Sequence, residues 1–288
     1  RWAAWLAGVP VIVHTIHGFG ITSAQPWWLR RLLIGLERLT GLITTHWIAV
    51  AEVNIEEGLR WKLFNRKRAT VIRPGIDPRP FQAPLARPER DRIRADFGAA
   101  PGDKLVGMVA CLKPQKAPHD FVNVAARVCA RLPSARFVLI GDGELRPAVE
   151  AQIRAAGLED RVRIVGWRRD VPTVMRALDA FLLTSHWEGL ARVLLEARAS
   201  GVPVVATRVG GAEEAITDGL HGRLCGAGDV GGLAGRLCEV LADTELRGGG
   251  ELPAEFDIRE MLAQCERLYA KLLASDSRGS DVLKDCPA

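Results

Sequence analysis

The chain has 288 residues, of which 48% are hydrophobic and 25% charged, which fits a globular protein long enough for two domains. No apolar run approaches the roughly 20 residues that span a bilayer, and the six cysteines form no CxxC or Cys/His cluster, which excludes a zinc-binding or disulfide-rich framework. The net charge of +5 favours anionic partners such as nucleotides, phosphorylated lipids or an anionic membrane surface.

Residues 1–80 predict part of a domain built around parallel strands. The β-branched run "VPVIVHTIHG" from Val9 is typical of a buried strand that continues into a loop. Leucines at helical spacing in "WWLRRLLIGLERL" predict a helix over 27–39, and further strands are expected at 47–52 and 69–75.

Residues 81–103 are rich in proline and charge and predict a linker that ends in a short charged helix. Over 104–255 strands alternate with helical segments, which predicts an α/β fold with a parallel sheet covered by helices on both faces. An apolar stripe over 256–274 predicts a C-terminal helix that packs back toward the first domain, and 275–288 is expected to be a flexible tail. The predicted strands of the second domain are 105–110, 136–141, 161–166, 180–185 and 202–207.

Ligands of such sheets bind outside the carboxyl ends of the strands, so the loops that follow the strands are the candidate site. These loops are rich in glycine, basic residues and carboxylates. They span residues 111–118, 141–146, 166–170, 185–190 and 208–214.

The stretch "SHWEGLARVLLE" holds two glutamates eight positions apart. Glu188 lies in the loop before a helix predicted to begin at Leu190, and Glu196 lies about two turns into that helix. The N–H groups of Gly189 and Leu190 are then free at the positive end of the helix dipole, where a phosphate can bind, while carboxylates nearby can accept hydrogen bonds from sugar hydroxyls. The alternative is two solvated glutamates on a helix.

This E-x7-E pattern, together with the "ASGVPVVATRVGGAEEAITDGLHGRL" that follows it, resembles retaining glycosyltransferases of family 4. The resemblance covers residues 9–273. It implies the GT-B fold of two Rossmann-like, doubly wound parallel-sheet domains, of which the first is incomplete here. The start of that domain is expected to lie outside this chain, with an exposed sheet edge as the result.

The resemblance also implies roles for the residues of this stretch. Glu188 is expected to contact the donor sugar and Glu196 the ribose of a nucleotide, while the amides of Gly189 and Leu190 meet the diphosphate. Lys116 in "CLKPQK" would neutralise the diphosphate leaving group.

The position that matches the second cation of the family site departs from the family pattern. An arginine is usual there, but Cys111 takes its place in this chain. Lys113 is a candidate for the missing positive charge, with simple exposure to solvent as the alternative.

Two further loops match family segments that line the nucleotide. Gly141 and Gly143 in "GDGELR" would let backbone approach the ligand closely, although a tight strand-to-helix turn explains them equally well. Gly166, Trp167 and Arg168 in "GWRRD" match the place where family members bind the base. For the arginine, an ordinary solvated charge is the alternative.

In the first domain, His17 of "HTIHG" matches a histidine that contacts the donor sugar or the acceptor, and near neutral pH it could also move a proton. A structural histidine at a strand end is the alternative, and it is the favoured interpretation of His14. The helix over 27–39 fits either a membrane surface, with Trp and Leu beside Arg, or packing on the sheet with its Arg heads in water.

The function implied by the resemblance is hexosyl transfer from a UDP-, GDP- or ADP-sugar to a glycan or lipid-linked acceptor, with retained anomeric configuration. Glu188, Lys116 and His17 would carry the reaction. No DxD-like acidic pair is in place for a metal, so no metal or other cofactor is expected, and no nucleic acid partner. The expected location is the cytoplasm, or the inner face of the membrane. The alternatives are a non-catalytic nucleotide-sugar-binding remnant and a nucleotide-sugar epimerase of the same fold.

Overall fold

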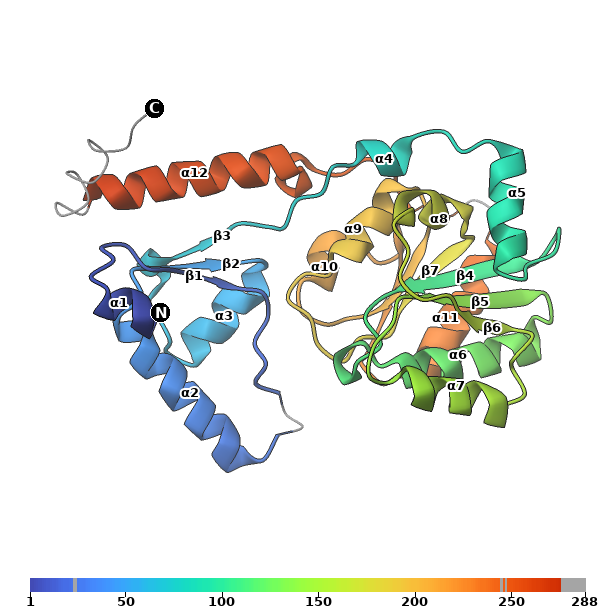
Figure 1. The fold of residues 1–288 in the computed structure, drawn as a ribbon, viewed down its shortest axis with the longest axis horizontal. Coiled ribbons are helices and arrows are strands. Elements are labelled where there is room, and N and C mark those ends of the chain that lie inside the picture. The colour runs from blue at the N-terminus through green and yellow to red at the C-terminus, as the bar shows by residue number, and fades with distance from the viewer. Residues whose placement is uncertain (23–24, 244–245, 247, 276–288) are drawn as a thin grey trace. The chain divides into compact units, whose positions relative to one another are not determined.

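The computed structural model describes residues 1–22, 25–243, 246 and 248–275. The chain forms two compact units (Figure 1). The first consists of Arg1–Gly75 with the segment from Ala254 onward, and the second of Ile76–Pro253. Apart from Ser275, the tail predicted for 275–288 lies outside the described residues.

The first unit contains a three-stranded parallel sheet in the order β1-β2-β3. Its strands are β1 (Val13–Ile16), β2 (His46–Ala49) and β3 (Ala69–Val71). Its helices are α1 (Trp2–Leu6), α2 (Trp27–Leu42), α3 (Glu52–Arg60) and α12 (Ile258–Ser275), with 3-10 turns at Arg66–Arg68 and Ala254–Phe256. The parallel sheet was predicted, whereas α1 and α3 were not.

Trp47 of β2 is the centre of the core of the first unit. Its side chain is fully buried, and its ring packs against Phe64 at a centroid distance of 5.0 Å. The ring of His14 meets it edge-on at 5.1 Å, and burial lowers the pKa of His14. His14 is therefore a packing residue that favours the neutral form, in agreement with its interpretation as a structural histidine.

Helix α12 joins the first unit through a close contact with Gly75. The Gly75 N–H lies 3.3 Å from Sδ of Met261, and a Cβ at position 75 would come within 2.5 Å of the Ile258 backbone. Only glycine fits this contact. Among the described residues, no helix combines the length and the apolar character that crossing a bilayer requires.

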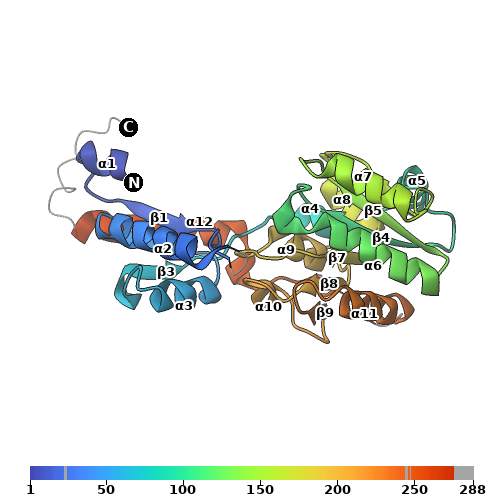
Figure 2. The same ribbon diagram turned by 90° about the horizontal axis from the view of Figure 1, so that it is seen from below.

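The second unit contains a six-stranded parallel sheet in the order β6-β5-β4-β7-β8-β9 (Figures 1 and 2). From β4 the chain winds outward through β5 and β6, then crosses back to β7 and winds outward on the other side. The carboxyl ends of β4 and β7 therefore flank the point at which the winding reverses, the usual ligand position in such sheets. The strands are β4 (Lys104–Val109), β5 (Ala135–Ile140), β6 (Val162–Ile164), β7 (Ala180–Leu183), β8 (Val204–Thr207) and β9 (Gly222–Cys225).

Helices cover both faces of this sheet, as predicted. Helices α6, α7 and α11 pack together on one face, and α8 and α9 on the other, where α4 and α5 join them (Figures 1 and 2). The helices are α4 (Arg79–Gln82), α5 (Arg87–Asp96), α6 (Pro118–Arg131), α7 (Arg146–Ala155), α8 (Val171–Ala177), α9 (Arg192–Ala199), α10 (Ala212–Ala215) and α11 (Val230–Ala242), with a 3-10 turn at Pro114–Lys116.

Two ion pairs fasten α5 to the amino edge of the sheet. Arg94 is buried and donates to Asp179 at 2.8 Å, and Arg90 donates to the same carboxylate at 3.0 Å. The N–H of Leu105 also donates to the Asp179 carboxylate, at 2.7 Å. Helix α5 is thus a charged helix within 81–103, as predicted, and it packs on the second unit.

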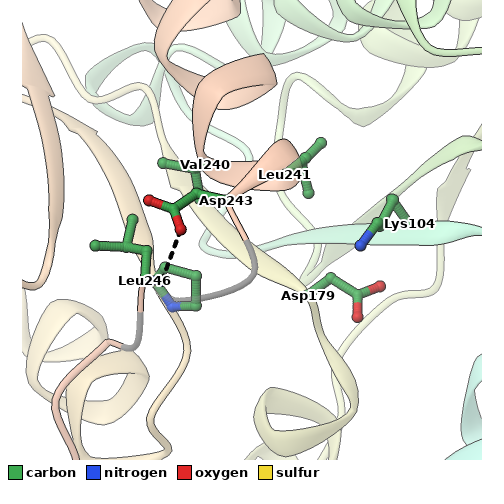
Figure 3. A pocket seen from close by; sticks show the side chains of 7 residues that line it. Lys104, Asp179, Val240, Leu241, Asp243 and Leu246 are labelled. Atoms are coloured by element: carbon green, nitrogen blue, oxygen red, sulfur yellow. Dashed lines mark hydrogen bonds between the residues drawn. The ribbon is translucent and has the colours of Figure 1, made fainter.

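A pocket of about 240 Å³ opens at this amino edge (Figure 3). Asp179 lies at its wall, as does Asp243, which accepts a hydrogen bond from the Leu246 N–H at 3.0 Å. This edge is opposite to the loops at the carboxyl ends of the strands. The residues that line the pocket are Lys104, Asp179, Pro203, Val240, Leu241, Asp243 and Leu246.

Candidate functional site

The structure brings Lys116 and Glu188 together at the carboxyl edge of the second unit's sheet. Lys116 ends the 3-10 turn after β4, and Glu188 lies in the loop after β7. Nζ of Lys116 lies 2.5 Å from Oε1 of Glu188, and the two side chains are only 17% and 9% exposed. A largely buried cation and a largely buried carboxylate thus meet where the winding of the sheet reverses.

Backbone and side-chain hydrogen bonds join the two loops. The His186 N–H donates to the Gln115 carbonyl at 2.8 Å, and the Gln115 side chain returns a bond to the Trp187 carbonyl at 3.0 Å. The Thr184 hydroxyl lies 3.0 Å from the carbonyl oxygens of both residues that precede α6, Lys116 and Ala117. These bonds fix the spacing between the loops.

Ala117 adopts a left-handed conformation at this junction, with φ +46° and ψ +55°. This conformation costs a non-glycine residue about 1–2 kcal/mol. It lets the chain leave the turn that carries Lys116 and enter α6 at Pro118 within a single residue. The strain lies directly beside the buried lysine.

Ser185 and Gln115 also contact Glu188, and the sequence analysis missed both. Oγ of Ser185 lies 2.6 Å from Oε1 of Glu188, and Nε2 of Gln115 lies 3.4 Å from Oε2. The Ser-x-x-Glu spacing within one loop could have indicated the first contact. Nothing in the sequence indicates the second, which spans 73 positions.

The loop after β8 supports Glu188 from the other side. Gly210 has φ +53°, and a Cβ there would lie 2.4 Å from the carbonyl oxygens of both Glu188 and Gly189. The Gly211 N–H donates to the Gly189 carbonyl at 2.5 Å. Glycine is therefore required at position 210 for this loop to press against the chain at Glu188.

The predicted start of the helix is wrong by two residues. Helix α9 begins at Arg192, with Ala191 in an extended conformation before it, so Gly189 and Leu190 precede the helix. The bond from the next loop to the Gly189 carbonyl holds this segment outside the helix. The N–H groups of Gly189 and Leu190 make no hydrogen bond to any described residue, so they are available beside Glu188.

Glu196 lies in the second turn of α9. Burial raises its pKa, and the nearby Arg192 opposes this shift only in part. No described residue donates a hydrogen bond to its carboxylate. Such a group is suited to accept hydrogen bonds from a ligand, because they would replace the water lost on burial.

The structure gives Gly141 and Gly143 a packing role. A Cβ at Gly141 would lie 2.0 Å from the Ala110 carbonyl oxygen, and one at Gly143 would lie 2.5 Å from that of Leu112. The Leu112 N–H donates to the Asp142 carbonyl at 3.0 Å. The loop after β5 thus lies directly against the start of the loop that carries Lys116.

The segment at Gly166 lies next to the loop after β5. Gly166 has φ +72°, and its carbonyl accepts a backbone hydrogen bond of 2.8 Å from that loop. Trp167 is 68% exposed. Arg168 donates two hydrogen bonds to Asp170, at 2.5 and 2.8 Å, and lies over the ring of Phe97. Arg168 is therefore held by protein groups, whereas the indole of Trp167 is open to solvent.

Among the described residues, the side chains of His17, Lys113 and Cys111 make no hydrogen bond to Glu188. His17 follows β1 in the first unit and is exposed, so it is not among the residues gathered in the second unit. Lys113 is half-buried and forms no ion pair with a described acid, and Cys111 is half-buried at the end of β4. Within the described part of the chain, no group of His, Cys, Asp and Glu side chains is arranged to hold a metal ion.

The model of the family "Glycosyl transferases group 1" matches residues 89–248, more than half of the chain. The chain belongs to this family. The match spans the four loops that carry Lys116, Gly141, Gly166 and Glu188, so the family assignment and the geometry of the site rest on the same segments.

Two curated relatives match most of the chain. An Escherichia coli "UDP-Gal:alpha-D-GlcNAc-diphosphoundecaprenol alpha-1,3-galactosyltransferase" is 29% identical over 250 residues, 85% of this chain and 64% of that protein. A Bacillus anthracis "N-acetyl-alpha-D-glucosaminyl L-malate synthase" is 30% identical over 276 residues, 93% of this chain and 70% of that protein. The chain therefore spans about two thirds of the length of these relatives.

A solved structure confirms the predicted GT-B fold. The crystal structure of Anabaena Alr3699/HepE in complex with UDP and glucose superposes with a TM-score of 0.81. It covers 94% of this chain and 74% of that chain at 24% identity. The glycosyl transferases group 1 chain described here thus shares its architecture with that structure.

Proposed function

We propose that this chain carries the donor-binding side of a retaining hexosyltransferase, which moves a sugar from a nucleoside diphosphate to a glycan or lipid-linked acceptor. The observation that carries the proposal is the buried Lys116–Glu188 pair at the reversal point of the sheet. The names of the relatives support it, since one is a galactosyltransferase with a UDP-linked donor and a diphosphoundecaprenol-linked sugar acceptor.

The cation and the amides of the site are suited to the leaving group. As the bond from the anomeric carbon to the phosphate oxygen breaks, negative charge develops on the diphosphate. Lys116 would neutralise that charge, and the N–H groups of Gly189 and Leu190 would donate to the same oxygens. Lys113, which has no acidic partner among the described residues, would supply the second cation in place of the arginine that Cys111 replaces.

The carboxylates of the site are suited to hydroxyl groups. Glu188 would accept a hydrogen bond from the donor sugar and hold its anomeric carbon in place, and Glu196 would accept from the ribose. The backbone at Gly166 and the exposed indole of Trp167 would contact the base, with Arg168 fixed beside them. His17 would contact the sugar or the acceptor from the first unit.

We propose UDP as the nucleotide of the donor and no metal requirement. Among UDP-, GDP- and ADP-linked sugars, UDP is favoured by the UDP-Gal named for the E. coli relative and by the UDP bound in the similar solved structure. Positive charge for the diphosphate is available from Lys116 and Lys113, so neutralisation does not depend on a divalent cation.

Binding and turnover of UDP-sugars test the proposal. Calorimetry with UDP, UDP-glucose, UDP-galactose and UDP-N-acetylglucosamine is expected to show binding that Lys116→Met weakens. Transfer to a lipid-linked sugar acceptor, followed by chromatography, is expected to give an α-linked product. Binding without release of UDP would instead identify a non-catalytic sugar-nucleotide-binding protein, and an epimerised donor without acceptor would identify an epimerase. Absence of nucleotide binding would refute the proposal.

We further propose that α2 contacts a membrane surface. Trp27, Trp28 and Leu32 are 70%, 57% and 53% exposed, and Arg31 lies over the ring of Trp27 at 5.7 Å. Exposed aromatic and leucine side chains beside arginine fit the boundary of an anionic bilayer. The chain is expected to co-sediment with vesicles that contain phosphatidylglycerol. The double variant Trp27→Ser with Trp28→Ser is expected to remain in the supernatant. Equal retention of this variant would refute the contact.

A further inference from the structure

The two carboxylate oxygens of Glu188 have different surroundings. Oε1 accepts from Lys116 Nζ at 2.5 Å and from Ser185 Oγ at 2.6 Å. Among the described residues, Oε2 is bonded only by the Gln115 amide at 3.4 Å, which is too long for a strong hydrogen bond. Oε1 is therefore saturated by protein donors, whereas Oε2 retains the capacity to accept a strong hydrogen bond.

Both neutral donors are held rigidly. Ser185 is fully buried at the end of β7, and its carbonyl accepts from the Thr207 hydroxyl at 2.6 Å. Gln115 is held through its backbone and its side chain. Its backbone carbonyl accepts from the His186 N–H, and its side-chain amide donates to the Trp187 carbonyl. These donors therefore remain in place when a ligand displaces mobile groups.

We propose that Ser185 and Gln115 are positioning residues that present Oε2 of Glu188 to the donor sugar. The inference rests on the proposed function and deepens it. When Lys116 turns toward a diphosphate, Oε1 loses one of its two bonds, and the Ser185 hydroxyl keeps the carboxylate from rotating. The amide of Gln115, which contacts Oε2, restricts the direction in which Oε2 points. A carboxylate torsion is otherwise broad and twofold, so this restraint selects the oxygen that faces the sugar.

The test separates binding of the sugar from binding of the nucleotide. Ser185→Ala removes the hydroxyl, and Gln115→Met removes the amide at nearly constant size. Ser134→Ala and Gln82→Met are matched controls, because Ser134 lies at the amino edge of the sheet and the Gln82 amide also donates to a backbone carbonyl, that of Gly250. Dissociation constants are measured by calorimetry for UDP and for whichever of UDP-glucose, UDP-galactose and UDP-N-acetylglucosamine binds most tightly.

The expected result is a change in the ratio of the dissociation constant for the UDP-sugar to that for UDP. Ser185→Ala should weaken binding of the UDP-sugar about ten- to a hundredfold, the loss expected for one hydrogen bond to a charged group. Gln115→Met should weaken it severalfold, because its contact with Glu188 is long. UDP affinity should stay within about twofold in both variants and both controls, since a general loss of structure would weaken both ligands equally. In steady-state transfer, kcat should fall more than KM rises.

The outcomes distinguish the inference from the function on which it rests. If the wild-type chain binds UDP and a UDP-sugar, and neither variant changes their ratio, the positioning role is overturned while the proposed function stands. If the wild-type chain binds no UDP-sugar, both are overturned. Thermal unfolding identifies a variant that does not fold. Gln115 is half-buried, so Gln115→Met keeps the test decisive if Ser185→Ala fails to fold.

Discussion

Glu188→Gln should bind free UDP more tightly than the wild-type chain does. In the absence of ligand, Lys116 is paired with Glu188 at 2.5 Å, so a diphosphate must compete with a carboxylate for the same ammonium group. The substitution removes that competitor and also the repulsion between two anions. The amide oxygen of glutamine can still accept a hydrogen bond from Lys116, which keeps the loop geometry close to that of the wild type.

The exposure of the pair sets the size of the gain. At 2.5 Å the gross attraction is about 7 kcal/mol for an effective dielectric constant of about 20, but desolvation offsets most of it. Exposed pairs contribute about 0.2–1 kcal/mol net, and loss of one partner of a fully buried pair costs about 3–5 kcal/mol. With side chains 17% and 9% exposed and the Ser185 bond retained, an intermediate value of about 1.5 kcal/mol applies. The affinity for UDP should therefore rise about tenfold.

Calorimetric titration with UDP at constant ionic strength measures this gain. Glu239→Gln is the control, since Glu239 pairs with Arg236 on α11 and is 54% exposed. In a Lys116→Met background, Glu188→Gln should no longer raise the affinity for UDP. An unchanged or lower UDP affinity in Glu188→Gln would show that the ion pair does not compete with the diphosphate, and the reasoning would be wrong.

Three further predictions concern stability. Gly210→Ala should lower the free energy of unfolding in urea by about 2–4 kcal/mol, because the added Cβ would meet two carbonyl oxygens at a residue with positive φ. Gly226→Ala is the control, since a Cβ there lies in open space and should not lower it. Equal urea midpoints for the two variants would refute the close contact at Gly210. Glu196→Gln should raise the thermal midpoint at pH 8 but not near pH 4. Burial raises the folded-state pKa of Glu196, so wild-type stability falls as pH rises from the unfolded pKa through the folded one; a constant difference across pH would contradict this. Arg94→Met should cost about 2–3 kcal/mol by leaving Asp179 with fewer donors, yet leave UDP affinity unchanged, since it lies at the opposite edge of the sheet; calorimetry and urea unfolding check both halves of this prediction.

The sequence predicted most elements that have an apolar pattern, and it missed the short helix α1, the polar helix α3 and strand β9. The five strands predicted for the second domain all form. Strands β4, β5, β7 and β8 are largely buried apolar runs, whereas the edge strand β6 has the exposed Arg163 between two apolar residues. Strand β9 was missed, since "GRLC" shows neither a long apolar run nor an alternation of polar and apolar residues. In the first unit, the run from Val9 begins to pair only at Val13, and the predicted strand 47–52 ends at Ala49 because α3 begins at Glu52. Apolar composition alone does not mark where pairing starts.

The site was predictable to the level of the loops but not to the level of atoms. Lys116 and Glu188 could be placed together because loops at the carboxyl ends of neighbouring parallel strands meet at one edge. The start of α9 could not, because a bond from Gly211 to the Gly189 carbonyl decides it, and this bond is formed between distant loops. The contact of Gln115 with Glu188 depends on a rotamer across two loops, which no local pattern encodes.

The reversal point of the sheet also has a kinetic consequence. Strands β4 and β7 pair only through Val106 with Ala180 and Gly107 with Phe181, the shortest ladder in this sheet. This seam joins the two halves of the second unit, and its closure brings residues about 70 positions apart into contact, which costs chain entropy during folding. A ligand that bridges the loops on either side of the seam would bind only the closed form. It would therefore slow amide exchange in both strands together, so the seam is where binding and the cooperativity of folding are coupled.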